Sequence, residues 1–281
     1  MISSSVLGII LALASTASWG SGDFSGGFAT RSQNQFRVLF LTAIPGIVIL
    51  ALIALTAGEP VPSTKNIVWA LAAGLAGAMG TVSLYRGLST GSAATVAPAA
   101  GVIGAGLPVA FSIFFIGAPG VLKLAGFAVA IAGIWLVSRP DGGFVPSDRD
   151  GLMNAVLAGT GFGLFFILIA QVEQGLVFGP LVCSKTAALA LAAVIIVSRR
   201  EQIPSLTASP IALLAGVFDA GGNAFYMLAR QFTRLDVAAV LSSMYPAVTV
   251  VLSCLILKEK VSASQWRGVA LCVLAIALIS A

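Results

Sequence analysis

The chain has 281 residues, of which 58% are hydrophobic and only 9% are charged, with a formal net charge of +5. A water-soluble domain carries roughly 25% charged residues, so this composition excludes a soluble globular protein and indicates a chain embedded in a lipid bilayer. Histidine is absent, which removes imidazole bases and histidine metal ligands, and we expect no enzyme, no metal and no cofactor. The basic residues stand singly or in pairs at the ends of apolar runs, a pattern typical of membrane anchors rather than of nucleic-acid binding.

Ten apolar segments follow one another along the chain, each close to the roughly 20 residues that a helix needs to cross a bilayer. They lie near residues 5–29, 36–57, 66–88, 93–117, 120–138, 151–172, 177–198, 209–230, 235–257 and 261–280. Short connections rich in turn-forming residues join them, and the most charged one, residues 139–151, separates two groups of five. We therefore predict an all-α integral membrane protein with ten transmembrane helices.

The first segment contains the stretch WGSGDFSGGF, residues 19–28, which is close to a nucleotide-binding glycine loop. Such a loop follows a strand and opens a soluble helix, whereas these glycines lie inside an apolar span. Gly22 and Gly26 are four residues apart and share one helix face, where small residues allow a second helix to approach closely. The pattern predicts helix packing, not nucleotide binding.

The two groups of five segments resemble each other. A shift of 142 residues places Gly74 on Gly216, Gly80 on Gly222 and Gly126 on Gly268, and a shift of 143 places Trp19 on Phe162. Five spans are an odd number, so the second copy must cross the membrane in the opposite direction to the first. We predict two inverted five-helix repeats, over residues 1–140 and 150–281, and because one chain supplies both, a monomer is sufficient.

The sequence "ASWGS" in the first segment and the stretch from Asp236 to Ser280 carry a family resemblance. That stretch has an alanine-rich start, a proline within the span at Pro246, a short charged turn with Glu259, and a last helix led by Gly268. In these features the chain resembles the ten-helix EamA-type exporters of the drug/metabolite transporter superfamily, with bacterial exporters of amino acids, including aromatic ones, as the nearest branch.

The resemblance implies a secondary transporter that exports small amphipathic metabolites, amino acids foremost, across the inner membrane by alternating access. A multidrug exporter of lipophilic cations is the alternative, and proton coupling and facilitated diffusion both stay open.

Ionisable side chains are costly inside a bilayer, and this makes them the first candidates for a substrate site. Asp219, with Asn223 one turn further on, either binds a substrate ammonium or forms a structural ion pair. Lys185 pairs with Asp219 or Asp23, contacts a substrate carboxylate, or extends to the membrane surface. For Asp23, a role in the site and exposure to solvent are both open.

Aromatic side chains with a polar atom complete the predicted substrate site. Tyrosine and tryptophan inside a span either line a cavity, where they find hydrogen-bond partners, or pack between helices. Our candidates for the cavity wall are Trp19, Tyr85, Tyr226 and Tyr245.

Three prolines lie within the fourth and ninth segments, which correspond to each other in the two repeats: Pro98, Pro108 and Pro246. A proline inside a helix removes one backbone hydrogen bond and bends the chain, so these residues are either hinges for alternating access or static kinks.

Ten spans place both termini on the same side of the membrane. The loop charges favour an external N-terminus, since more lysine and arginine residues fall on the opposite side. The family resemblance implies the reverse, a plasma-membrane protein with both termini in the cytoplasm, and we follow the resemblance.

Overall fold

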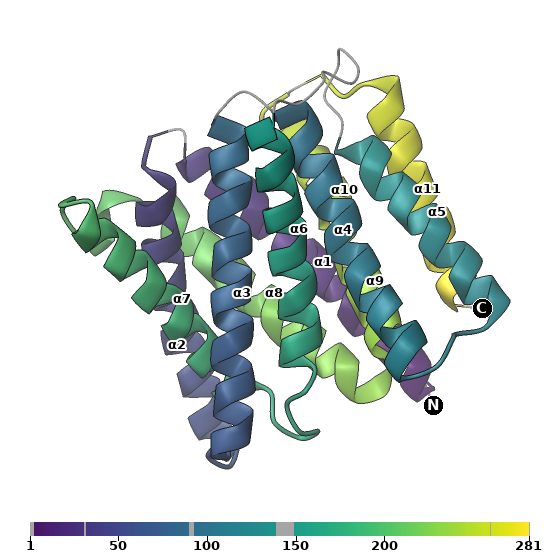
Figure 1. The fold of residues 1–281 in the computed structure, drawn as a ribbon, viewed down its shortest axis with the longest axis horizontal. Coiled ribbons are helices and arrows are strands. Elements are labelled where there is room, and N and C mark those ends of the chain that lie inside the picture. Colours follow the sequence, from purple (N-terminus) through teal and green to yellow (C-terminus); the bar gives the residue numbers. More distant parts are fainter. Residues whose placement is uncertain (1–2, 31, 90–92, 139–148, 259, 281) are drawn as a thin grey trace.

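The computed structural model describes residues 3–30, 32–89, 93–138, 149–258 and 260–280, and these residues form an antiparallel bundle of helices (Figure 1). The helices are α1 (Ser4–Ala29), α2 (Gln35–Thr56), α3 (Thr64–Ser89), α4 (Ala93–Phe115), α5 (Val121–Val137), α6 (Arg149–Ile169), α7 (Phe178–Ser198), the short 3-10 helix η1 (Leu206–Ala208), α8 (Pro210–Phe232), α9 (Leu235–Ser242), α10 (Tyr245–Ile256) and α11 (Ala263–Ser280).

The predicted architecture of ten spans is confirmed. Among the described residues, eight helical segments are long and apolar enough to cross a membrane, with α9 and α10 counted together, and two shorter apolar helical stretches lie in α4 and α5. Large apolar side chains such as Leu55, Phe114 and Leu255 are exposed on the outside of the bundle, where lipid acyl chains would cover them.

The ninth span is broken into α9 and α10, and Pro246 supplies the reason. In a continuous helix the carbonyl of Ser242 would accept a hydrogen bond from the backbone N–H of residue 246, which proline lacks. The turn between the two helices closes instead with a hydrogen bond of 3.1 Å from the N–H of Met244 to the carbonyl of Leu241.

The fourth span contrasts with the ninth, because α4 is helical from Ala93 to Phe115 and contains both Pro98 and Pro108 without a break. One missing backbone hydrogen bond is compatible with a continuous helix when neighbouring helices hold it, as Pro45 inside α2 also illustrates.

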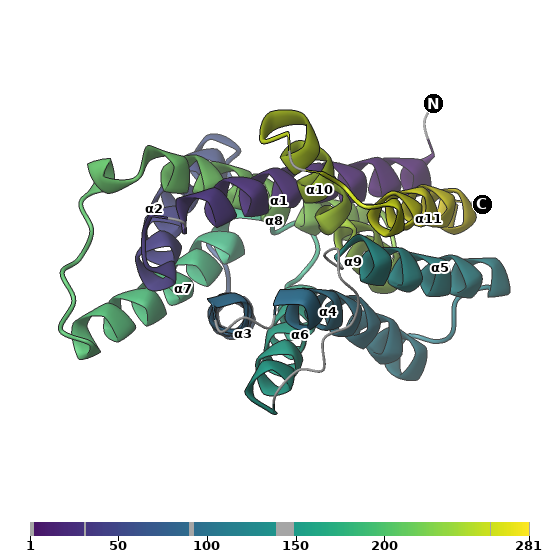
Figure 2. The same ribbon diagram turned by 90° about the horizontal axis from the view of Figure 1, so that it is seen from above.

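The two repeats are inverted and interlocked. Helix α1 starts at the end of the bundle where both termini lie, and its counterpart α6 starts at the opposite end (Figure 1). The first helix of each half packs on the third helix of the other half, α1 on α8 and α6 on α3, and α2 packs on α7 between them. Seen from above, helices of the two halves interleave, with α3 beside α6 and α5 beside α11, rather than forming two separate blocks (Figure 2).

Glycines related by the repeat make the tightest helix crossings. A Cβ atom added to Gly74 would lie 2.8 Å from the carbonyl carbon of Ser184, and one added to Gly216 would lie 2.8 Å from the carbonyl carbon of Thr42. Thr42 and Ser184 are themselves 142 residues apart, as are the two glycines. The same contact is therefore made twice, between α3 and α7 and between α2 and α8.

A second symmetric contact involves the aromatic residues of the first helix in each half. A Cβ on Gly80 would lie 2.9 Å from Cδ1 of Phe162, and one on Gly222 would lie 2.6 Å from Cγ of Trp19. Glycine is needed at both positions because the ring of the facing helix occupies the space of a side chain. These pairs show that the sequence repeat corresponds to a structural symmetry.

Hydroxyl groups join α1 to the second half of the chain. Each donates to a main-chain carbonyl oxygen of a neighbouring helix: Ser15 to Gly222 at 2.7 Å, Ser18 to Phe218 at 2.6 Å, Thr16 to Leu241 at 2.7 Å, and Thr249 of α10 to Gly20 at 3.1 Å. Such bonds hold helices together where the hydrophobic effect between them is absent.

The glycine crossings predict a specific loss of stability. We expect Gly74→Ala and Gly216→Ala each to lower the free energy of unfolding by about 1–3 kcal/mol, because the added methyl group must push two backbones apart. Gly106→Ala in α4 is the matched control, since a Cβ there meets no atom within 4 Å. Melting temperatures of the purified protein in detergent measure the difference, and equal values for the crossing and control variants would contradict it.

Candidate functional site

A cavity lies between the two halves of the bundle. Its empty volume is about 1030 Å³, including the part open to solvent, and its walls come from α1, α2 and α3 of the first half and α6, α7, α8 and α10 of the second. A second cavity shares Asp23, Leu84, Phe162 and Tyr245 with it and continues past the end of α5 at Ser138. The second cavity reaches Val137 and Ser138 at the C-terminal end of α5. That end of α5 lies at the end of the bundle opposite the termini (Figure 1).

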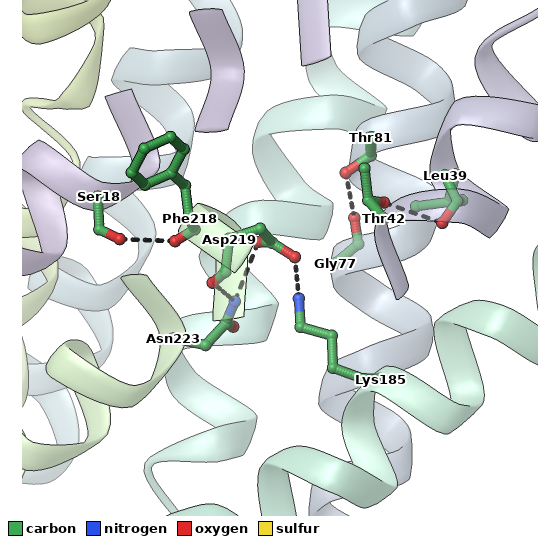
Figure 3. Close-up of polar contacts among 9 residues, drawn as sticks. All are labelled: Ser18, Leu39, Thr42, Gly77, Thr81, Lys185, Phe218, Asp219 and Asn223. Atoms are coloured by element: carbon green, nitrogen blue, oxygen red, sulfur yellow. Dashed lines mark hydrogen bonds and ion pairs between the residues drawn. The ribbon is translucent and has the colours of Figure 1, made fainter. Parts of the chain in front are cut away.

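The most polar part of the cavity wall is an ion pair between Lys185 of α7 and Asp219 of α8 (Figure 3). The Nζ atom of Lys185 contacts Oδ2 of Asp219, and the amide nitrogen of Asn223 donates to Oδ1 of the same carboxylate at 3.0 Å. Both oxygens of Asp219 therefore have a partner. The side chain of Asp219 still keeps 36% of its surface exposed, against 12% for Lys185, so a molecule in the cavity can reach the carboxylate.

Helix packing directs Lys185 toward this partner. Its aliphatic stem lies beside Gly46 of α2, where an added Cβ would approach Cδ of the lysine to 3.6 Å. Asp219 lies near the middle of α8, a helix long and apolar enough to cross a membrane, which favours pairing because an isolated charge within the bilayer would be costly. Of the alternatives for Lys185, the structure therefore selects pairing with Asp219.

Aromatic rings form the apolar side of the cavity. Trp19 lines it together with Phe162, Phe165 and Phe166, and the ring centroids of Trp19 and Phe166 are 5.5 Å apart in an edge-to-face arrangement. Tyr245 at the start of α10 also lines the wall. This wall offers apolar and π-electron surface opposite the charged groups.

Tyr226 differs from our expectation, since it does not line either cavity. Its side chain is fully buried behind Trp19, with the ring centroids 6.1 Å apart, and its hydroxyl donates to the carbonyl of Phe166 at 3.0 Å. Tyr226 supports the aromatic wall and does not face a substrate.

Five of the seven predicted substrate-binding residues thus come together around one cavity: Trp19, Lys185, Asp219, Asn223 and Tyr245. Tyr85 belongs to α3, and its side chain lies outside the described part of the structure, as does that of Pro98. Pro246 lines the second cavity beside Tyr245, at the break between α9 and α10.

Several lining residues were not among our candidates, and the repeat could have revealed two of them. Phe162 is the counterpart of Trp19, and Ser184 is the counterpart of Thr42, so a cavity between symmetric halves takes both members of each pair. Asp23, which we left open, also lines both cavities. Thr42 and Thr81 line the wall while donating to carbonyls of their own helices, so their hydroxyl protons are already used (Figure 3).

Two interlocked inverted repeats around a central cavity are the architecture of many membrane transporters. The sequence matches the profile of the EamA-like transporter family twice, over residues 6–139 and 149–281. The chain therefore belongs to the EamA-like transporter family, and the resemblance found in the sequence is confirmed.

The fold is shared with a protein of known crystal structure. That structure superposes with a TM-score of 0.72 over 96% of this chain and 95% of its own, at 20% sequence identity. No curated protein matches the chain in sequence.

The ion pair predicts that substitutions of its two residues will have non-additive effects on the free energy of unfolding. We expect Asp219→Asn and Lys185→Met each to destabilise the protein by about 1–3 kcal/mol, because either change leaves one charge unpaired within the membrane. The double variant restores electrical balance and should be more stable than the sum of the single losses indicates. Thermal unfolding of the four proteins measures the coupling, and strictly additive losses would show that the two charges do not interact.

Proposed function

We propose that the protein is a secondary transporter that exports small metabolites, foremost amino acids, across a bacterial inner membrane. The observation that carries this proposal is the pair of Lys185 and Asp219 in the wall of a cavity shared by both halves. An amino acid carries one ammonium and one carboxylate on neighbouring atoms, and the cavity presents one carboxylate and one ammonium side by side.

Binding proceeds by exchange of partners. The substrate ammonium takes the place of Lys185 on Asp219, and the substrate carboxylate pairs with the released Lys185. Each charge keeps an opposite charge beside it throughout, so no uncompensated charge forms within the membrane. In the absence of substrate Lys185 and Asp219 neutralise each other, so neither is left as an uncompensated charge when the empty carrier changes conformation.

Alternating access follows from the inverted repeats. Two halves related by inversion can adopt two equivalent tilts, one with the cavity open to each side of the membrane, and substrate shifts molecules between states that already exist. With both termini in the cytoplasm, as the family resemblance implies, a cavity running toward the opposite end corresponds to the outward-facing state.

Export of lipophilic cations is the second candidate. It is supported by the aromatic wall of Trp19, Phe162, Phe165 and Phe166, because aromatic faces attract cations whose charge is spread over an apolar body. For such a substrate Lys185 would be superfluous, and this distinguishes the two candidates.

Transport by the reconstituted protein tests the proposal. We expect proteoliposomes to take up labelled neutral amino acids saturably, faster when unlabelled substrate is present inside, and Asp219→Asn to lose most of this counterflow because the ammonium has no partner. Asp150→Asn is the matched control, since Asp150 lies exposed at the start of α6 outside both cavities. Counterflow of lipophilic cations without any amino-acid counterflow would contradict the proposal and favour the second candidate.

The break before Pro246 makes a separate prediction about turnover. Pro246→Ala supplies the missing N–H to the carbonyl of Ser242 and allows α9 and α10 to join into one stiffer helix. We expect transport to slow several-fold, measured as the maximal rate of counterflow.

Pro108→Ala is the matched control for this hinge, because α4 is already continuous at Pro108. An unchanged maximal rate in Pro246→Ala would show that the break is a static feature of packing.

A further inference from the structure

Asp23 is a second carboxylate in the cavity, and it differs from Asp219 in having no partner. It lies on α1 with its side chain exposed, and it lines both cavities. No hydrogen bond or ion pair to its carboxylate is present among the described residues, whereas both oxygens of Asp219 are engaged. Asp23 is therefore a charge directed at the cavity rather than one used to join helices.

The described charges of the cavity wall do not balance. Among the residues that the structure describes, the charged side chains lining the two cavities are those of Asp23, Lys185 and Asp219, which are two carboxylates and one ammonium. Within this described set, the ammonium of Lys185 is already paired with Asp219, and no second cation is present to pair with Asp23. A bound zwitterion adds no net charge, so it would leave Asp23 without an opposite charge beside it.

We propose that the substrate is an amino acid with a cationic side chain, whose ammonium or guanidinium binds Asp23 while its α-ammonium and α-carboxylate bind Asp219 and Lys185. This inference rests on the function proposed above and specifies the substrate class of the same cavity. The three charges of such a molecule are opposite in sign to the three described charges of the wall, so each of these groups gains a partner of opposite charge.

The surroundings of Asp23 suit a long side chain that ends in a cation. Trp19 is one helical turn before Asp23 on α1, so the two side chains lie on the same face of the helix. Leu84, Phe162 and Tyr245 line both cavities together with Asp23. An aliphatic stem can pack against these residues, and the aromatic faces add attraction for the cation at its end.

The repeat argues against a purely structural role for Asp23. The shift of 143 residues that relates Trp19 to Phe162 places Asp23 on Phe166, an apolar residue of the wall. The helix packing of this architecture is therefore achieved without a carboxylate at the equivalent position. The charge is an addition to the packing, as a recognition group would be.

Arginine and citrulline make a matched pair of probes, because they have nearly the same shape and citrulline lacks the side-chain charge. In proteoliposomes containing the full-length protein, we expect arginine to drive counterflow at a concentration about 10-fold to 100-fold lower than citrulline, as the loss of one close charge partner requires. Asp23→Asn should reduce this preference to about twofold or less while citrulline counterflow continues. Asp23→Glu retains the charge and should retain the preference, and Asp150→Asn should leave it unchanged.

Each other outcome overturns the inference in a recognisable way. Equal affinities for arginine and citrulline in the unmodified protein, or an undiminished preference in Asp23→Asn, would show that Asp23 does not recognise substrate and would leave the proposed amino-acid exporter intact.

Agmatine, which is arginine without its carboxylate, should bind more weakly than arginine because Lys185 lacks a partner. Transport of agmatine without transport of any amino acid would overturn the proposed function together with the inference.

Discussion

The close helix contacts made by repeat-related glycines set the position of everything else in the molecule. Gly74 and Gly216 let the third helix of each half touch a backbone of the opposite half, and Gly80 and Gly222 leave room for the rings of Phe162 and Trp19. In a bilayer the hydrophobic effect does not drive helices together, so packing of small residues must do so. Because these contacts occur in symmetric pairs, the space that remains lies on the axis between the halves, and that space is the cavity.

The charges break the symmetry that the glycines establish. Asp219 corresponds to Gly77 in the first half, Lys185 corresponds to Ala43, and Asp23 corresponds to Phe166 in the second half. An inverted repeat explains two equivalent conformations, but a substrate with distinct ends needs different groups on the two sides of its site. The architecture thus comes from what the halves share, and recognition comes from where they differ.

The helices around the cavity also differ in how firmly hydrogen bonds hold them. Helix α1 is tied to α8, α9 and α10 by hydroxyl-to-carbonyl hydrogen bonds, including those of Ser15 and Thr16. The ninth span is broken in front of Pro246, between the points where α9 and α10 are hydrogen-bonded to α1, while its counterpart α4 runs through Pro108 unbroken. Movement between states is therefore expected to concentrate at the α9–α10 junction, next to Tyr245 in the cavity wall.

The sequence by itself determined the class of the protein, because hydropathy counts the spans, the near-constant offset of Gly74, Gly80 and Gly126 reveals the repeat, and an odd number of spans per repeat requires inversion. It also pointed to Asp219 and Lys185, since charge inside a span is rare. Only the tertiary structure decided that these two residues are partners, that Asp23 is not, and that Tyr226 stands behind the wall. Those outcomes depend on the rotation of each helix about its axis and on which helices become neighbours, and both are set by packing between segments far apart in the chain.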